Sequence, residues 1–253
     1  MTSQLQSTTP KALVACEESQ RVCAELRRVG LEAYSCDILD CSGGHPEWHI
    51  KQSVEYLLDG KVNFKTCDDI EHYVESWDLI IAHPPCTYLT VSGNSYFYHS
   101  GYRRLAKSDP DLVNSLIEKR KSNRESAIKF FMMFTKASCK HVAIENPIGV
   151  MSTVYRKPDC IIQPYQFGSP VSKSTCFWLK GLPPLKPTCV VEPTKKITYS
   201  SGKSMDPWYA KTFRLKPDER AKERSKTFPG IAKAIAEQWG ILVLNELLAK
   251  GYT

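Results

Sequence analysis

Short apolar runs alternate with amphipathic segments along most of this chain. The strand-like runs are residues 12–16 (ALVAC), 32–38 (EAYSCDI), 77–83 (WDLIIAH) and 141–146 (HVAIEN), with a weaker one at 63–70 (NFKTCDDI). Short apolar runs bounded by polar or turn residues are typical of buried strands. Residues 160–168 and 174–181 carry a similar pattern and read as a strand pair that closes the sheet.

Helical periodicity fills the intervals between these runs. Residues 19–30 place Val22, Leu26 and Val29 on one face, and Gly30 ends that helix. The other predicted helices are 46–60, with Ile50, Val54, Leu57 and Leu58 at helical spacing, 123–139, and 229–248, which starts at Pro229. Strand and helix in alternation predict an α/β fold, a mostly parallel sheet with helices on both faces.

The composition changes between residues 181 and 226. Prolines, lysines and a Ser-Ser-Gly stretch dominate there, which is typical of irregular structure. We therefore expect a main domain over 1–180, a small basic lobe over 181–226, and a C-terminal segment over 227–253 whose helix returns to the main domain.

Charge, hydropathy and cysteine content favour an intracellular protein with a basic surface over a membrane-spanning or disulfide-bonded secreted one. The formal net charge is +7, and basic residues concentrate in 103–124 and 195–226, which favours a nucleic-acid face or two solvated surfaces. No apolar run approaches ~18 residues, so no membrane span is expected. The N-terminal MTSQLQSTTPK lacks the apolar core of a signal peptide, and the ten cysteines form no CxxC pair. Free thiols in a reducing cytoplasm are therefore expected.

Chemically distinctive side chains follow the predicted strands. Those at or just after strand ends are Glu17, Glu18, Asp37, Asp68, Asp69, Pro84, Pro85, Cys86, Glu145 and Asn146. Ligands of such sheets bind outside the carboxyl ends of the strands, so a site is expected at this edge. A carboxylate in the position of Asp37 is typical of ribose binding, and Asp68 or Asp69 would accept from an adenine amino group. Capping and surface roles remain open for all three.

Cys86 has two readings. A free cysteine is usually a small buried hydrophobe, but the two prolines before it hold the backbone rigid, which suits a nucleophile. Glu145 lies inside an apolar run, so its carboxyl is expected to be protonated or paired, and a raised pKa would suit an acid. His83 would either tune the thiolate or hydrogen-bond a loop carbonyl.

Two further groups of residues have open interpretations. Cys41, His45 and His49 have spacing compatible with zinc, although such histidines are more often surface or core residues, and no metal is expected. Aromatic residues precede Arg103 and Arg104 and would either stack on bases or pack this insertion down. They are Tyr88, Tyr96, Phe97, Tyr98 and Tyr102.

The motif HPPC at 83–86, followed about sixty residues later by ENP at 145–147, resembles the cytosine-C5 DNA methyltransferases. In that family the nucleophile lies in a PPC motif and the acid in ENV. Residues 166–179 (QFGSPVSKSTCFWL) and 228–240 (FPGIAKAIAEQWG) are similar to two later motifs of the family. The likeness covers most of the chain in the right order and is closest to compact phage and bacterial members.

The resemblance implies a class I S-adenosylmethionine-dependent methyltransferase fold, a Rossmann-like doubly wound sheet with a small irregular recognition lobe. It implies methyl transfer to C5 of a flipped cytosine in double-stranded DNA, by a cytoplasmic protein of a bacterial cell, encoded by the bacterium or a phage. A monomer is favoured and no membrane contact is expected.

Site roles follow residue by residue from the same resemblance. Cys86 would add to C6, Glu145 would protonate or hydrogen-bond N3, and Asn146 would orient the Cys86 loop. Lys173 and Thr175 stand where the family has two arginines, the second of which helps hold the base. The implied cofactor-binding residues are Cys16, Glu17, Glu18, Asp37, Ile38, Asp68, Asp69 and Pro84. The implied DNA-binding residues are Tyr88, Arg103, Arg104 and Lys173.

The sequence also departs from the family. CEESQ at 16–20 replaces a glycine-rich loop, so Glu17 and Glu18 would bind the ammonium group of S-adenosylmethionine or select a derivative of it. The asparagine of the final motif is missing, with Gly230 nearby. The alternatives are an amino-methyltransferase for N4 of cytosine or N6 of adenine, transfer of a modified group, and an inactive DNA-binding homologue.

Overall fold

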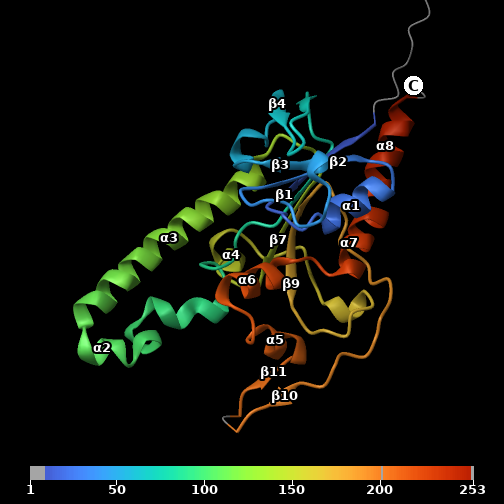
Figure 1. Ribbon diagram of the computed structural model, residues 1–253. Coiled ribbons are helices and arrows are strands. Elements are labelled where there is room, and N and C mark those ends of the chain that lie inside the picture. The colour runs from blue at the N-terminus through green and yellow to red at the C-terminus, as the bar shows by residue number, and fades with distance from the viewer. Residues whose placement is uncertain (1–8, 201, 252–253) are drawn as a thin grey trace, which may run out of the picture.

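The computed structural model describes residues 9–200 and 202–251. Most of the N-terminal MTSQLQSTTPK stretch lies outside these ranges. The described chain forms a seven-stranded mixed sheet, mostly parallel, with helices packed on both faces (Figure 1). The expected α/β architecture is confirmed, and it is compatible with a Rossmann-like fold.

The sheet order is β3-β2-β1-β6-β7-β9-β8. Its strands are β1 (Lys11–Ala15), β2 (Glu32–Asp37), β3 (His49–Lys51), β6 (Leu79–Ala82), β7 (Val142–Pro147), β8 (Cys160–Ile162) and β9 (Thr175–Lys180). The first five in this order run parallel, whereas β9 is antiparallel to both β7 and β8. The carboxyl ends of β1, β6 and β7 therefore meet at one edge, and the expected closing pair is β8–β9.

Side chains of β1 alternate between two apolar cores, one on each face of the sheet. Leu13 and Ala15 pack in the core beneath α3 (Pro110–Lys136), whereas Ala12 and Val14 pack in the core beneath α1 (Arg21–Arg28). All four of these strand side chains are fully buried. Strands buried on both faces read as continuous apolar runs, which is why ALVAC was recognisable.

The terminal helix follows the prediction with one irregularity. It comprises α7 (Pro229–Ile235), a π-helical turn at Ala236–Gly240, and α8 (Ile241–Gly251). A side chain at Gly240 would press against Leu26 and Val29, so glycine at the π turn allows close packing on α1.

A long arm leaves the sheet on the opposite face. The 27-residue helix α3 starts well before the predicted boundary at 123, and α2 (Leu105–Ser108) lies at its far end (Figure 1). Two 3₁₀ segments, Val91–Phe97 and His99–Tyr102, complete this insertion. The short helix α4 (Met151–Val154) follows β7.

The predicted helix over 46–60 is wrong. This segment forms a 3₁₀ turn at Pro46–Trp48, strand β3, and a second 3₁₀ turn at Val54–Tyr56. The buried His49 explains the difference, because its Nδ1 lies 2.9 Å from Ser35 Oγ and its Nε2 lies 2.9 Å from the Leu39 carbonyl. These contacts anchor the segment beside β2 as an additional parallel strand, overriding the helical spacing of its apolar residues.

The predicted strand over 63–70 does not join the main sheet. It forms β4 (Val62–Lys65), which pairs with β5 (Glu71–Val74) in a separate antiparallel hairpin. Asp68 and Asp69 lie in its exposed turn, where Asp69 has a φ of 64°. The premise that they end a third parallel strand is therefore wrong, since turn chemistry at Cys-Asp-Asp reverses the chain.

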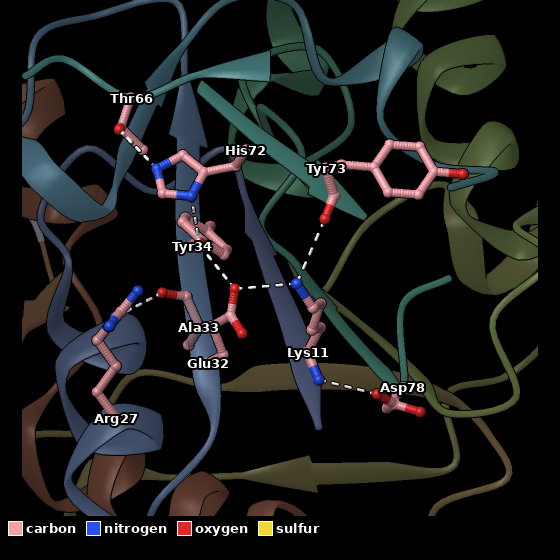
Figure 2. A network of polar contacts seen from close by, with 9 residues as sticks. All are labelled: Lys11, Arg27, Glu32, Ala33, Tyr34, Thr66, His72, Tyr73 and Asp78. Carbon is pink, nitrogen blue, oxygen red and sulfur yellow. Dashed lines mark hydrogen bonds and ion pairs between the residues drawn. The ribbon is translucent and has the colours of Figure 1, made fainter. Parts of the chain in front are cut away.

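A polar network ties this hairpin to the amino ends of β1 and β2 (Figure 2). His72 lies 3.0 Å from the Tyr34 hydroxyl, which donates to Glu32 at 2.8 Å. Glu32 also pairs with Lys11 at 3.1 Å, and the Lys11 amide donates to Asp78. The network is at the end of the sheet away from Cys86, so it stabilises the fold rather than the site.

The segment 181–226 is mostly irregular, as expected. Its elements are β10 (Ile197–Thr198), β11 (Ser204–Met205), α5 (Pro207–Thr212) and α6 (Pro217–Ser225). The boundaries at 180 and 226 stay predictions.

All ten cysteines, each within the described ranges, are free thiols. Among the described helices, none has both the length and the apolar character needed to cross a bilayer.

Candidate active site

Two loops at the carboxyl ends of β6 and β7 are fastened to each other. The side-chain amide of Asn146 donates to the Pro84 carbonyl at 2.8 Å, so β7 holds the backbone two residues before Cys86. This is the contact that the orienting role expected of Asn146 requires. Pro84 is buried, and Cys86 lies exposed at the surface of the edge.

A second set of contacts continues this attachment beyond Cys86. The Val150 amide donates to the Leu89 carbonyl at 2.9 Å, and Thr90 forms an isolated bridge with Gly149. A Cβ atom at Gly149 would come within 2.1 Å of the same Leu89 oxygen. Only glycine permits this approach, so the ENPIG segment is shaped to hold the loop that carries Cys86.

The Cys86 thiol lies within the field of the expected acid. Desolvation by the walls of the site raises its pKa, the Glu145 carboxylate raises it further, and the Lys173 ammonium opposes both. The structure thus brings together Cys86, Glu145 and Lys173. In this form of the site the thiol is favoured over the thiolate.

Glu145 is paired rather than protonated. Its Oε2 lies 3.3 Å from Nδ1 of His83, and the side chains are 21% and 8% exposed respectively. Burial alone would raise the pKa of Glu145, but the hydrogen bond with His83 and the charges of His83 and Lys173 outweigh burial and lower it. The expected raised pKa is wrong, and His83 contacts Glu145 instead of the alternative loop carbonyl.

Lys173 and Thr175 line a small cavity together with His83 and Glu145. Lys173 donates to the Arg224 carbonyl at 2.8 Å, and its ammonium lies 5.8 Å from the ring centres of both Trp208 and Phe228. The hydroxyl of Thr175 donates to the carbonyl of Lys173 at 3.3 Å. The lysine is therefore held over the site by residues of the 181–226 lobe and the start of α7.

The lobe contributes residues that the sequence did not single out. Burial raises the pKa of the Tyr209 phenol, Arg224 opposes this, and the charges of Cys86 and Glu145 add to the rise, which places Tyr209 of α5 close to both. Arg224 fixes Tyr209 by donating to its carbonyl and lying 5.1 Å from its ring centre. Lys226 and Phe228 line the cavity with Glu145. Arg224 and Lys226 were signalled only by the basic composition of 195–226 and Phe228 by the motif at 228–240, whereas Tyr209 had no signal.

The two glutamates after β1 have different roles. Glu17 is buried, and its carboxylate accepts from the amides of Val22 at 2.7 Å and Cys23 at 3.1 Å. It therefore occupies the N-terminus of α1, where Gln20 provides no side-chain cap. Glu17 is turned into the fold, contrary to the expected approach to a cofactor.

Glu18 keeps one carboxylate oxygen unsatisfied. Its Oε2 accepts from Ser42 and lies 3.5 Å from the ammonium of Lys222, which comes from α6. Its Oε1 is buried and has no hydrogen-bond partner among the described residues. A buried carboxylate oxygen without a donor is costly, so this atom marks a place where a ligand donor fits.

The other residues expected to bind the cofactor differ in how far they are buried. Asp37 ends β2, accepts from the Leu39 amide at 3.0 Å, and has its pKa raised mainly by burial. Ile38 beside it is 72% exposed, and Cys16 has a left-handed φ of 59°. These three, like Glu18, follow or end β1 and β2 at the carboxyl edge, where the charge of Glu18 also raises the pKa of Asp37. Asp68 and Asp69 lie apart, in the β4–β5 turn.

The zinc-like cluster does not assemble. Both ring nitrogens of His49 have the protein partners given above, whereas His45 stacks on Trp48 and its Nδ1 lies 2.9 Å from Glu47. Within 9–200 and 202–251, no group of histidine, cysteine and carboxylate side chains has the arrangement of a metal site.

The expected DNA-binding residues divide into packed and exposed ones. The ring of Tyr88 lies 5.2 Å from the Arg120 guanidinium, and its hydroxyl accepts from Asn123. Arg124 lies 3.4 Å from the ring centre of Phe97. For Tyr88 and Phe97 the packing interpretation therefore describes the structure, whereas Arg103 and Arg104 are exposed on the arm.

Three buried polar atoms at this edge lack partners among the described residues. They are Oε1 of Glu18, Nε2 of His83 and Oδ1 of Asn146. Native structures satisfy most buried polar atoms, so such a group is typical of a site that binds a polar ligand. No model of a known protein family matches this chain, and no curated protein matches it.

Proposed function

We propose that this protein is a DNA cytosine-C5 methyltransferase that transfers a methyl group through a covalent adduct of Cys86. The observation that carries the proposal is the placement of Cys86 and Glu145 at the carboxyl ends of adjacent parallel strands, with Cys86 in the field of Glu145 and both in the field of Lys173. A nucleophile beside a carboxyl that exchanges protons is the pair that addition to a pyrimidine ring needs.

The chemistry of the base follows from this pair. The target cytosine leaves the duplex and enters the site, where the Cys86 thiolate forms a bond to C6. The C5–C6 double bond opens, and N3 accepts a proton from Glu145. S-adenosylmethionine, when bound, supplies the methyl group that C5 receives. Solvent water then takes the proton on C5, which restores the double bond and expels the Cys86 thiolate, while N3 returns its proton to Glu145.

The thiolate must form, with its proton released to solvent water, although Cys86 favours its neutral form in this state. Lys173 is the nearby cation that lowers the pKa of Cys86, and Glu145 is the anion that raises it. Protonation of Glu145 as the base binds removes that opposing charge. Proton delivery to the base and activation of the nucleophile therefore support each other.

The residues at the ends of β1 and β2 fit an adenosine-containing cofactor. Asp37 offers a carboxylate for ribose hydroxyls, and the exposed Ile38 offers an apolar surface for a base. Glu18 Oε1 offers an unsatisfied acceptor for the ammonium group. The Glu17 carboxylate already accepts from the first amides of α1, so of the two glutamates Glu18 is the one that would bind the ammonium group.

The test combines product analysis with covalent trapping. Cells that express the protein should contain 5-methylcytosine in their DNA by mass spectrometry, and Cys86→Ala should abolish it. Cys189→Ala is the matched control, because Cys189 is also an exposed free thiol but lies outside the site. A duplex containing 5-fluorocytosine should become linked to the wild-type protein and not to Cys86→Ala.

Each other outcome overturns the proposal in a recognisable way. Methyl on an exocyclic amine without a trapped adduct would identify an amino-methyltransferase. A heavier group on C5 would identify a derivative of the cofactor as the donor. Unmodified DNA, with salt-dependent DNA binding retained, would identify an inactive binding protein.

A further inference from the structure

His83 occupies a position that the proposed reaction has not used. It follows β6 directly, its side chain is 8% exposed, and its Nδ1 faces Oε2 of Glu145 at 3.3 Å. Its Nε2 is buried without a hydrogen-bond partner among the described residues. The contact between this imidazole and the Glu145 carboxylate lies in the wall of the cavity that both residues line.

In the resting state Glu145 is ionised, so a second group must supply the proton that N3 of the cytosine receives. His83 and Lys173 keep Glu145 ionised despite its burial, so the carboxylate alone has no proton to give. Addition of a thiolate to cytosine nevertheless requires one at N3. His83 is the group in hydrogen-bond contact with Glu145 whose ring can carry a transferable proton.

We propose that His83 holds the proton that Glu145 delivers to N3 of the target cytosine, an inference that rests on the proposed function. His83 is in this sense a positioning residue that acts through Glu145. In the imidazolium form of His83 the Nδ1–H bond breaks, its proton moves to Oε2 of Glu145, and a neutral imidazole that keeps its proton on Nε2 remains. Rotation of the resulting carboxyl turns the O–H toward N3, which takes the proton. When N3 later releases it, the proton returns by the same route, so the relay is restored after each turnover.

Several charged groups besides Glu145 surround His83. Glu17 in the β1–α1 turn is near enough for His83 to lower its pKa against the effect of burial, so a second acid stabilises a positive imidazole. Lys173, just before β9, and Lys226, just before α7, line the same cavity. Their ammonium groups disfavour a positive charge on the His83 ring. Cys86 lies on the same loop, and Tyr209 approaches from α5. The pair is thus balanced between two carboxylates and two ammonium groups.

The variant His83→Asn separates proton transfer from simple hydrogen bonding. Asparagine places an N–H donor close to the position of Nδ1 but cannot release a proton. The matched control is His141→Asn. His141 is another buried histidine, 4% exposed, whose Nε2 lies 3.1 Å from Glu246, but it is at the opposite end of β7. Thermal melting followed by circular dichroism shows that each variant folds, and His83→Gln replaces His83→Asn if the latter does not.

The readout is the single-turnover rate of adduct formation on a 5-fluorocytosine duplex, measured from acid to alkaline pH. For His83→Asn we expect a loss of about a hundredfold, typical of a lost proton donor. We also expect the alkaline limb to move to lower pH, because Glu145 is then the remaining proton site of the pair, and a carboxyl releases its proton at lower pH than an imidazolium does. His141→Asn should retain the wild-type profile.

Two results would overturn the inference, and they are distinguishable. If the wild type forms adduct and His83→Asn shows no loss, or a uniform loss with an unmoved alkaline limb, the relay is wrong and the proposed function stands. If the wild type itself forms no adduct, the proposed function fails and this inference fails with it.

Discussion

The side chain of Asn146 holds the carbonyl of Pro84 at 2.8 Å, which couples the end of β7 to the loop after β6. Both residues are buried, and the second amide atom of Asn146, Oδ1, has no partner among the described residues. A proline at 84 and another at 85 leave the backbone little freedom before Cys86. This hydrogen bond, together with the bridge between Thr90 and Gly149, sets the position of the thiol relative to Glu145, the neighbour of Asn146 on β7.

Replacing Asn146 by Asp should therefore disturb Cys86 without changing side-chain size. A carboxylate facing the Pro84 carbonyl sets two acceptors against each other, at a cost of about 1–3 kcal/mol in the free energy of unfolding. Adduct formation on 5-fluorocytosine DNA should slow at least tenfold. Denaturant unfolding and trapping measure the two effects, with exposed Asn63→Asp as control. Unchanged trapping would contradict the orienting role.

Gly149 offers an independent way to move the same loop. An alanine Cβ would meet the Leu89 oxygen at 2.1 Å, a backbone atom that moves only with its loop. We expect Gly149→Ala to lose about 1–3 kcal/mol of stability, as overpacking usually does, and most of its trapping activity. Gly93→Ala is the control, because its Cβ would come within 2.6 Å of a side-chain end, that of Arg120, and would meet the nearest backbone atom, the Thr87 oxygen, at an ordinary 3.5 Å. Equal effects of the two substitutions would argue against a specific role of the Gly149 contact.

Much of this site was predictable because parallel strands buried on both faces appear in the sequence as continuous apolar runs. The runs ending near Ala15, Asp37, Ala82 and Asn146 became β1, β2, β6 and β7, and topology alone then gathers Cys86 and Glu145 at one edge. The order of the strands carries this information, and no side-chain contact is needed to infer it.

The errors have local physical causes. His49 is polar, yet two hydrogen bonds bury it in a strand where apolar spacing indicated a helix. Asp68 and Asp69 looked like strand-end carboxylates, but they form a hairpin turn. The inward turn of Glu17 and the pairing of His83 with Glu145 depend on side-chain orientation, which the pattern of residues along a chain does not specify.

The buried carboxyl of Glu17 predicts a pH dependence of stability. Burial raises the pKa of Glu17 above its ordinary 4.5, while His83 and two backbone amides oppose the rise. The folded chain then binds this proton more tightly than the unfolded chain. The corresponding stability is fully present below pH 4.5 and is lost as pH rises through the folded-state pKa.

Glu17→Gln should remove this dependence, because the amide stays neutral. As pH rises from 4.5 toward neutrality, the free energy of unfolding of the wild type should fall relative to that of Glu17→Gln. Glu17→Ala should cost about 1–2 kcal/mol at any pH by uncapping α1. Urea unfolding at several pH values measures both, with exposed Glu55→Gln as control. A difference of opposite slope would show that Glu17 is stabilised as the anion.

Glu18 should affect binding of the cofactor more than stability. If its unsatisfied Oε1 receives the ammonium group, Glu18→Gln loses a charge-assisted hydrogen bond and should weaken S-adenosylmethionine binding about tenfold or more. Lys222→Met should strengthen binding, because it frees Oε2 from a competing cation. Isothermal titration calorimetry measures both, and Glu71→Gln on the hairpin is the control. Equal affinity of wild type and Glu18→Gln would exclude this contact.

The arm and the lobe are two candidate DNA surfaces, and salt dependence separates them. Arg103 and Arg104 are exposed on the arm, whereas Lys195 and Lys196 are exposed on the lobe. Removal of one side chain that neutralises a phosphate should lower the slope of log affinity against log salt by about 0.9. We expect Arg103→Ser/Arg104→Ser to reduce the slope by nearly twice that amount, measured by fluorescence anisotropy on a labelled duplex. The double variant Lys195→Ser/Lys196→Ser makes the same change of charge. A reduced slope for the lobe variant, with an unchanged slope for the arm variant, would assign the duplex to the lobe and leave the arm a structural insertion.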